Sequence, residues 1–311
     1  MTAKVSVVIP CYNAERWIGQ TLQSVFSQTW PNLEVIVIDD GSTDASAALI
    51  ENLGQGRVNL IRQQKRGAAA ARNVGLGKAS GDYVQLLDAD DLLDSDKIAL
   101  QISRLQGQPR SVASASWGRF YDKPEDTRFE NEGLSRDFDP LDWLVHSRTE
   151  GLGMMFPALW LIPMPIVHAA GPWREDLSLA DDSEYFTRIL LAADRVLFCD
   201  GARCRYRSGV ATSLSASKNW GSAFTSLGLC ESNVRVREDS ERVRRGFSLS
   251  WQHLAHACYP YDPALAERAL AHARTLHPET IQPGGGTTFR VLARLVGWRT
   301  ARRLQVASGR P

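Results

Sequence analysis

Several features that mark particular classes of protein are scarce in this sequence. Its five cysteines are scattered, odd in number and without a CxxC pair, which excludes the common zinc sites and favours a reducing, cytoplasmic environment. Its formal net charge is only +1, from 36 basic and 35 acidic residues, so we expect neither a polyanion binder nor a nucleic acid partner. Its histidines have no acidic or cysteine neighbours at the spacing of metal ligands.

Long hydrophobic runs and a leader pattern are also missing. The first residues, MTAKVSVVIP, begin a strand pattern at once, so we expect no signal peptide. The most apolar segment, residues 151–171, is interrupted by Pro157, Pro163 and Pro165. We expect a strand and a short helix there, because a membrane-spanning helix needs a continuous apolar stretch.

The first hundred residues alternate between two hydrophobic periods. Short apolar runs, typical of buried strands, lie at residues 5–10, 33–39, 58–62 and 82–87. Helical spacing fills the intervals over 18–26, 43–53 and 67–79, with Asn13 expected to cap the first helix. Strand–helix units in succession predict an α/β fold, with a mostly parallel sheet covered by helices on both faces.

Beyond residue 110 the alternation loosens. Short strands are expected around 112–116 and 158–162, helices over 139–146 and 181–192, and two more strands at 195–199 and 202–207. From about residue 215 the sequence predicts helices only, with a loop at QPGGG, residues 282–286. We find no internal repeat.

Polar clusters follow three of the predicted strands: CYN, DDGSTD and DADD. In open parallel sheets, ligands bind beyond the carboxyl ends of the strands. The sequence therefore predicts one crevice, lined by Tyr12, Asp39, Asp40, Asp88 and Asp90.

The DADD cluster concentrates negative charge at the end of an apolar strand. Asp88 and Asp90 are two residues apart, so their side chains point the same way on an extended segment. Hard oxygen ligands in small number suit Mg²⁺ or Mn²⁺ held jointly by protein and substrate phosphates. The alternative is a solvated loop, with Asp91 in a turn and Asp94 or Ser95 capping the next helix. The motif alone leaves both open.

Two longer segments join these clusters into one pattern. VSVVIPCYNAERWIGQTLQSVFSQTWPNLEVIVIDDGSTDAS contains P-x-Y-N, S-x-x-x-Q-T and D-D-G-S-x-D, and RGAAAARNVGLGKASGDYVQLLDADD contains A-R-N and L-D-A-D-D. In order and spacing this pattern resembles the family 2 glycosyltransferases, which have the GT-A fold. The resemblance covers roughly residues 4–210 and is strongest up to residue 106.

The resemblance implies roles for residues on the nucleotide side of the crevice. Tyr12 would stack on the base, Asp40 would accept hydrogen bonds from the base edge, and backbone groups near Pro10 would frame it. Asp39 is expected to hold the loop. Arg72 would lie beside the nucleotide, with a surface helix arginine as the alternative.

On the diphosphate side, the resemblance implies that Asp88 contacts the ribose or a metal-bound water. It implies that Asp90 ligates Mg²⁺ or Mn²⁺, which would neutralise charge on the departing diphosphate.

A later segment, GPWREDLSLADDSEYFTRIL, is similar to the second half of the family, in which an E-D pair carries the general base. The pair here is Asp181–Asp182, so the resemblance assigns Asp182 as the base that deprotonates the acceptor hydroxyl, with inversion at the anomeric carbon. The alternative is a carboxylate that only favours the helix dipole. Asp181 replaces a glutamate, and no histidine lies near Gly209, where Arg207 is the substitute to consider.

Residues 287–311 are basic and contain no acidic residue. They fit a peripheral contact with an anionic membrane, where a lipid-linked acceptor would lie, and equally a helix docked on the core. We therefore expect a cytoplasmic protein, with peripheral attachment to the inner face of the cell membrane as one interpretation.

These patterns predict a GT-A domain over residues 1–212, with a nucleotide-binding half at about 1–106 and an acceptor-side half at about 107–212. A helical extension would follow over 213–311. The predicted function is inverting transfer of a sugar from a nucleotide-diphosphate donor to a glycan or lipid-linked acceptor, in the synthesis of cell-surface polysaccharide. UDP is the expected nucleotide, with GDP and dTDP open.

Two other enzyme classes are excluded by an absence. CYNAER contains no glycine, whereas nucleotidyltransferases and dinucleotide-dependent oxidoreductases need a glycine-rich phosphate loop after the first strand. A catalytically inactive sugar-nucleotide-binding or scaffold protein of the same fold remains the alternative.

Overall fold

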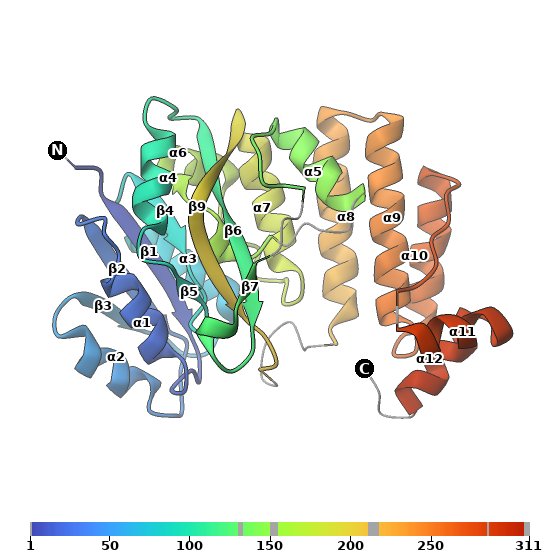
Figure 1. Cartoon of the computed structure of the whole chain (residues 1–311), viewed down its shortest axis with the longest axis horizontal. Helices are drawn as coiled ribbons and strands as arrows, with labels where there is room; N and C mark the ends of the chain where they lie inside the picture. The colour runs from blue at the N-terminus through green and yellow to red at the C-terminus, as the bar shows by residue number, and fades with distance from the viewer. Residues whose placement is uncertain (1, 130–132, 150–154, 211–217, 285, 308–311) are drawn as a thin grey trace.

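The central sheet has the strand order β3-β2-β1-β4-β8 in the computed structural model, which describes residues 2–129, 133–149, 155–210, 218–284 and 286–307. Its strands are β1 Val5–Cys11, β2 Leu33–Asp39, β3 Val58–Arg62, β4 Tyr83–Leu86 and β8 Ile162–Pro163. The first four are parallel, and β8 runs antiparallel to β4. The predicted α/β fold with a mostly parallel sheet is confirmed (Figure 1).

Helices α1 Ile18–Phe26, α2 Ser46–Gly54 and α3 Ala68–Lys78 connect the four parallel strands, and α4 Lys97–Leu105 follows β4 further along the chain. All seven residues of β1 are buried, as expected for a strand covered on both faces. Helix α3 packs directly on β1 and β2. Gly75 permits this approach, because a Cβ there would lie 2.4 Å from Val8 Cγ1 and 2.6 Å from Ile38 Cδ1.

A second sheet has the order β5-β9-β6-β7. Its strands are β5 Leu92–Leu93, β6 Ser111–Phe120, β7 Arg128–Phe129 and β9 Arg195–Arg207. The single long β9 corrects our expectation of two strands at 195–199 and 202–207. The extra residues form a bulge opposite Ala115 and Ser116, with Gly201 at φ +80°, so the strand bends without ending.

The expected strand at 158–162 is also corrected. Residues Pro157–Leu159 form a 3₁₀ turn, and only the two residues of β8 pair with β4. Helix α6, Met164–Ala170, follows at once. This short strand and helix occupy the apolar segment that we excluded as a membrane span, and in the described part of the chain no helix combines the length and apolarity needed to cross a bilayer.

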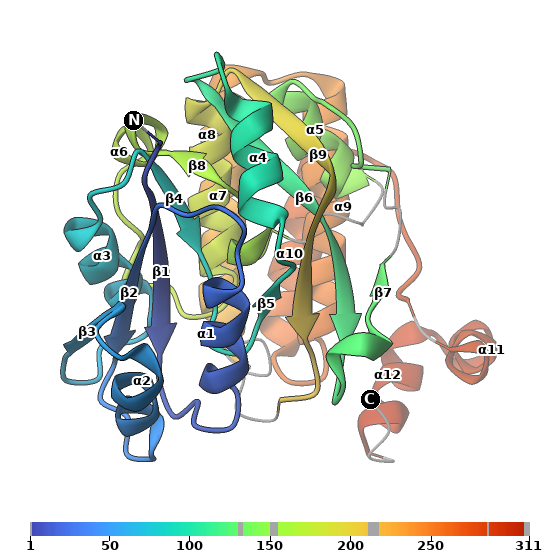
Figure 2. The same cartoon turned by 60° about the vertical axis from the view of Figure 1, so that its left-hand side comes forward.

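The remaining helices are α5 Pro140–Thr149, α7 Asp181–Ala192, α8 Trp220–Arg237, α9 Glu241–Cys258, α10 Pro263–Leu276, α11 Thr287–Val296 and α12 Trp298–Ala307. Helix α8 packs on α7, α9 packs on α5, and α10 packs on α9. Figure 1 shows α8, α9 and α10 as a row of helices beside the α/β core, and in the turned view of Figure 2 the same helices lie behind the core. The C-terminal region is thus helical, as predicted.

The first loop differs from our expectation for Asn13. Helix α1 begins at Ile18 with Trp17 at its N-cap, and no side chain caps it. Asn13 adopts φ +48°, and its Oδ1 accepts a hydrogen bond from the backbone N–H of Thr43 at 2.8 Å. Asn13 therefore ties the loop after β1 to the loop after β2, because its distance from the helix leaves it free to bond elsewhere.

Candidate active site

The polar clusters after β1, β2 and β4 lie at one edge of the central sheet. The parallel register pairs Cys11 with Asp39, and Val8 with Leu86, so the carboxyl ends of these strands are neighbours. This is the edge at which open α/β sheets bind ligands.

Asp40 is buried, and its carboxylate holds the loop that leads into α3. Its Oδ1 accepts hydrogen bonds from Gln63 Nε2 at 2.6 Å and from the backbone N–H of Arg66 at 2.8 Å. Its Oδ2 accepts from the backbone N–H of Gly67 at 2.7 Å. A carboxylate accepts about four hydrogen bonds, so roughly one acceptor position remains for a ligand.

Tyr12 stands at the end of β1 with 41% of its surface exposed. The ammonium of Lys65 lies 3.8 Å from its ring centroid, a cation–π contact that sequence reasoning did not single out. Pro10 is buried inside β1, and the Asp39 carboxylate accepts the backbone N–H of Ser42 at 3.0 Å, the loop-holding contact expected of it. An exposed ring at a strand end offers a surface for stacking.

Arg72 is only 4% exposed, which rules out the surface-arginine alternative. Its guanidinium donates to Asp88 Oδ1 at 2.7 Å and to Asp181 Oδ2 at 3.0 Å, and lies 4.4 Å from the ring centroid of Trp173. Burial opposes its charge, but the carboxylates of Asp88 and Asp181 outweigh burial and raise the pKa of Arg72 above its ordinary value.

Asn73, the neighbour of Arg72 in the A-R-N motif, was missed by sequence reasoning. Its Nδ2 donates to the carbonyl of Trp173 at 2.9 Å, and its Oδ1 accepts the N–H of Trp173 at 2.8 Å. Its Nδ2 also contacts Glu175 Oε1 at 3.0 Å. Arg72 and Asn73 together fasten α3 to the loop that precedes α7, and their adjacency in the motif was the available signal.

Asp90 is the member of the DADD cluster whose carboxylate has no hydrogen-bond partner in another residue of the described part of the chain. It is half-buried, and its carboxylate receives no hydrogen bond or ion pair from any other residue in the described ranges. Burial, together with the nearby negative charge of Asp88, raises the pKa of Asp90 to about 6.

Asp91 is fully buried, whereas Asp88 and Asp90 are partly exposed, so burial contradicts the solvated-loop alternative at Asp91 alone. Its Oδ1 accepts the backbone N–H of Arg207 at 2.9 Å, and its Oδ2 has no partner among the described residues. Burial and the adjacent carboxylates hold the pKa of Asp91 well above its usual range. The N-cap of α4 is Asp96, so the expected cap at Asp94 or Ser95 is wrong.

Arg207 comes from the end of β9 and lies against the same loop. Its Nε donates to the carbonyl of Asp90 at 3.0 Å and its Nη2 to Gln20 Oε1 at 2.6 Å. Its guanidinium is 4.4 Å from the ring centroids of both Trp17 and Phe120. The structure therefore places the cationic side chain of Arg207 beside Asp90. Arg207 is the residue that the sequence offered as a substitute for the missing histidine.

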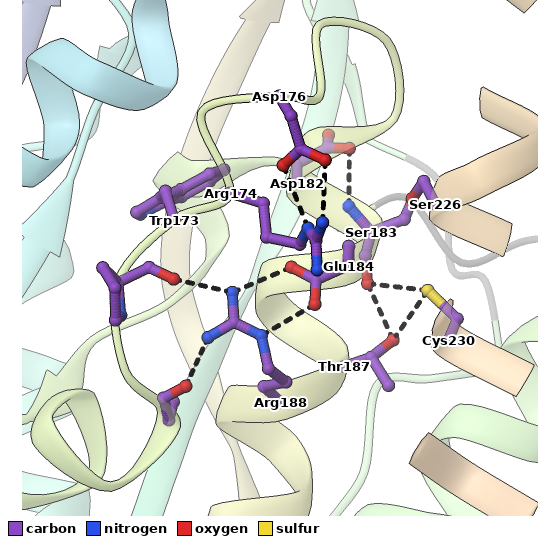
Figure 3. A network of polar contacts seen from close by, with 12 residues as sticks. Trp173, Arg174, Asp176, Asp182, Ser183, Glu184, Thr187, Arg188, Ser226 and Cys230 are labelled. Atoms are coloured by element: carbon purple, nitrogen blue, oxygen red, sulfur yellow. Dashed lines mark hydrogen bonds and ion pairs between the residues drawn. The ribbon is translucent and has the colours of Figure 1, made fainter. Parts of the chain in front are cut away.

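Asp181 and Asp182 are the first two residues of α7, and Figure 3 shows Asp182 at the N-terminal end of this helix. The Oδ1 of Asp182 accepts the N–H of Ser183 at 2.7 Å. Burial and the charge of Asp181 raise the pKa of Asp182 to about 7, which suits a group that takes up a proton near neutral pH. Both residues lie in the first turn of α7, where a negative charge also interacts favourably with the helix dipole.

Helix α7 is anchored by an ion pair between Glu184, which is buried, and Arg188, which is partly exposed. Arg188 donates to both carboxylate oxygens of Glu184, each at 2.8 Å (Figure 3). It also donates to the carbonyls of Ala170 and Pro172. The loop before α7 and the helix itself are therefore bonded into one unit.

A divalent cation fits this edge if the protein supplies few of its ligands. Within the described residues, no three His, Cys, Asp or Glu side chains are grouped as a metal site. Asp88 is engaged by Arg72, and Asp91 by backbone, whereas the Asp90 carboxylate is left to an outside partner. A hard carboxylate in a cluster of like charge is a suitable ligand for Mg²⁺ or Mn²⁺, with phosphate oxygens and water completing the shell.

Comparison with known sequences identifies a family. Residues 6–171 match the model of Glycosyl transferase family 2. The glycosyltransferase GlyG of Streptococcus pneumoniae serotype 4 is 31% identical over 224 residues, which cover 67% of this chain and 71% of GlyG. The chain spans much less of three further glycosyltransferase relatives, 41%, 15% and 17% of their lengths.

Two solved structures share the fold. S. aureus TarS 1–349, in complex with UDP-GlcNAc, superposes with a TM-score of 0.73 at 17% identity, covering 99% of this chain and 92% of that one. The mannosyltransferase PcManGT from Pyrobaculum calidifontis, in complex with GDP-Man and Mn²⁺, gives a TM-score of 0.61 at 19% identity, covering 98% and 87%. Sequence and fold agree: this chain belongs to glycosyltransferase family 2 and has the GT-A fold.

Proposed function

We propose that this enzyme is an inverting, metal-dependent glycosyltransferase that moves a sugar from a nucleoside diphosphate to an acceptor hydroxyl. The observation that carries the proposal is the guanidinium of Arg72, which is bonded to Asp88 on one side and Asp181 on the other. One buried cation thus joins the predicted diphosphate end to the helix that carries Asp182. A catalytic unit over 1–212 and a helical extension over 213–311 are part of this proposal.

The nucleotide would bind at the ends of β1 and β2. The exposed ring of Tyr12 offers a stacking surface, the remaining acceptor position of Asp40 suits an N–H of the base edge, and backbone near Pro10 frames the base. UDP is the first nucleotide to test, because TarS was solved with UDP-GlcNAc, and GDP is the second, because PcManGT was solved with GDP-Man.

The diphosphate would lie between Arg72, Asp88 and Asp90. Asp90 would hold Mg²⁺ or Mn²⁺, and Asp88, fixed by Arg72, would contact the ribose or a water of the cation. Mn²⁺ in the PcManGT complex supports this choice of ion. When bound, such a cation neutralises the charge that develops on the departing diphosphate.

Asp182 would act as the general base. Its ionised carboxylate takes the proton of the acceptor hydroxyl while that oxygen forms its bond to the anomeric carbon. The bond from the anomeric carbon to the diphosphate oxygen breaks on the opposite face, and its electron pair leaves with the diphosphate. A single displacement of this kind inverts the anomeric centre.

The test is a panel of UDP-glucose, UDP-GlcNAc, UDP-galactose and GDP-mannose with Mn²⁺, scored for released nucleoside diphosphate. We expect slow hydrolysis of one donor, lost in Asp90→Ala or with EDTA, and lost in Asp182→Asn while UDP–Mn²⁺ binding by calorimetry survives. Asp200→Asn, a change at an exposed carboxylate, is the matched control and should behave as wild type. If no donor binds or turns over, the inactive scaffold of the same fold becomes the better description.

For the acceptor, we propose a lipid-linked glycan of cell-surface polysaccharide synthesis, approached through the basic C-terminal helices. Helix α12 is docked on the row of helices, since Trp298 packs on Tyr259 at 5.0 Å between ring centroids and Arg299 pairs with Glu267 at 2.6 Å. Helix α11 instead exposes Val291 (53%) and Leu295 (77%). An apolar face flanked by arginines is what an anionic membrane surface attracts.

Vesicle sedimentation tests this contact. The protein should bind vesicles of phosphatidylcholine with phosphatidylglycerol and not phosphatidylcholine alone, and Arg290→Glu with Arg294→Glu should abolish binding. Arg268→Glu, a charge reversal on α10, is the control. Equal binding of all three proteins would reject α11 as the contact.

A further inference from the structure

Helix α8 contacts the turn that immediately precedes the two acidic residues of α7. This turn, residues 178–180, ends at Ala180, which adopts φ +61° and ψ 28° immediately before Asp181. A left-handed conformation is costly for a residue with a Cβ, so surrounding contacts must hold it.

Two serine hydroxyls of α8 supply those contacts. The Oγ of Ser222 accepts the backbone N–H of Ser178 at 2.9 Å and of Leu179 at 3.1 Å. The Oγ of Ser226 donates to the carbonyl of Ala180 at 2.6 Å. The strained residue and the two before it are thus hydrogen-bonded to one helix.

A third side chain on the same face of α8, that of Cys230, contacts α7. The Sγ of Cys230 contacts the carbonyl of Ser183 at 3.4 Å and accepts from Thr187 Oγ1 at 3.5 Å. Ser222, Ser226 and Cys230 are four residues apart, so they line one face of the helix. All three are buried, and Figure 3 shows Ser226 and Cys230 reaching the start of α7.

We propose that Ser222 and Ser226 are positioning residues for catalysis: they hold Ala180 in its left-handed conformation and thereby set where Asp182 meets the acceptor hydroxyl. The inference rests on the proposed role of Asp182. Its consequence is that a helix outside residues 6–171, the part matched by the family, completes the active site. Loss of either hydroxyl should let the turn relax and displace the carboxylate, while the nucleotide end, on other strands, is left intact.

The experiment compares Ser222→Ala and Ser226→Ala with Thr225→Ala. Thr225 is an exposed residue of the same helix whose hydroxyl donates to the carbonyl of Gly221, also in α8. Hydrogen exchange by mass spectrometry reports on residues 178–183 without requiring activity. Donor hydrolysis gives kcat, and calorimetry gives the Kd of UDP–Mn²⁺.

We expect faster exchange over 178–183 in both serine variants, a kcat about tenfold lower or more, and an unchanged Kd, with Thr225→Ala like wild type. Ala180→Gly in the Ser226→Ala background should restore part of kcat, because glycine adopts the left-handed conformation without strain.

Three results would overturn the inference. Unchanged exchange over 178–183 shows that the serines do not hold the turn. Faster exchange with kcat unchanged, in a protein that Asp182→Asn inactivates, shows that the turn does not position the base, and the proposed function stands. Wild-type turnover in Asp182→Asn removes the proposed base itself, and the positioning role fails with it.

Discussion

The two ends of the candidate active site differ in how far the charges of their carboxylates are compensated. At the nucleotide end, Asp40 is buried but accepts three hydrogen bonds, two of them from backbone N–H groups. At the other end, near the proposed diphosphate and acceptor positions, the pKa values of Asp90 and Asp182 are raised to about 6 and about 7. A carboxylate whose charge is compensated by hydrogen bonds holds a loop in place. A carboxylate without such compensation binds a cation or a proton more readily.

The charge of Arg72 offsets those of Asp88 and Asp181, so among changes that keep the proposed metal ligand and base its replacement should have the largest effect. Arg72→Lys should lower kcat/KM by about 100-fold, because one ammonium cannot bridge Asp88 and Asp181 as the planar guanidinium does. The measurement is donor hydrolysis. Arg174→Lys, in an exposed pair with Asp176, is the control. Turnover near wild type in Arg72→Lys would mean that the bridge is not used.

The raised pKa of Asp182 predicts opposite pH trends for activity and stability. Only the ionised base is active, so kcat should fall by about tenfold per pH unit below about 7 and level off above it. The folded protein holds a proton that the unfolded chain releases near the ordinary value of 3.8, so this group's contribution to the free energy of unfolding is complete below pH 3.8 and is lost as pH rises through about 7.

A pH–rate profile and thermal melts across the same range check both trends. In Asp182→Asn the melting temperature should lose the part of its pH dependence that lies near 7. A wild-type profile that is flat between pH 5 and 8 would contradict the assignment of Asp182 as the base.

The next largest difference is expected in the free energy of unfolding, when a carboxylate is removed from one end or from the other. Asp40→Ala leaves the backbone N–H groups of Arg66 and Gly67 without their acceptor and should lower the free energy of unfolding by about 2–3 kcal/mol. Asp90→Ala removes a partly buried carboxylate that accepts no side-chain hydrogen bond among the described residues, and should be neutral or stabilising in the absence of metal. Urea unfolding with EDTA measures both, and equal destabilisation would erase the contrast between the two ends.

The smallest effect is expected at the exposed ring. Tyr12→Leu should weaken UDP–Mn²⁺ binding by about three- to tenfold through loss of stacking, while Tyr12→Phe keeps the ring and should bind like wild type. Calorimetry decides between them. If Tyr12→Leu binds as wild type, the base does not stack on this residue.

Much of the nucleotide half could be predicted from local pattern. The strands, their parallel direction and the placing of CYN, DDGSTD and DADD at one sheet edge follow from periodicity and from where such sheets bind ligands, whereas the order of the strands came only from the structure. The hydrogen-bond partner of Asn13 could not be predicted in this way. The side chain of Asn13 could cap the helix or bond to another loop. It bonds to Thr43, because the fold brings the backbone N–H of Thr43 within hydrogen-bond distance.

The sequence by itself determined the fold class, the family and the residue types available at the site, because those depend on short-range spacing. Tertiary structure alone decided which carboxylates are compensated. Arg72 and Asp181 are 109 positions apart, and Ser226 and Ala180 are 46 apart, yet each pair is in hydrogen-bond contact. Charge compensation depends on distance in space and on burial, neither of which is written in the order of residues along the chain.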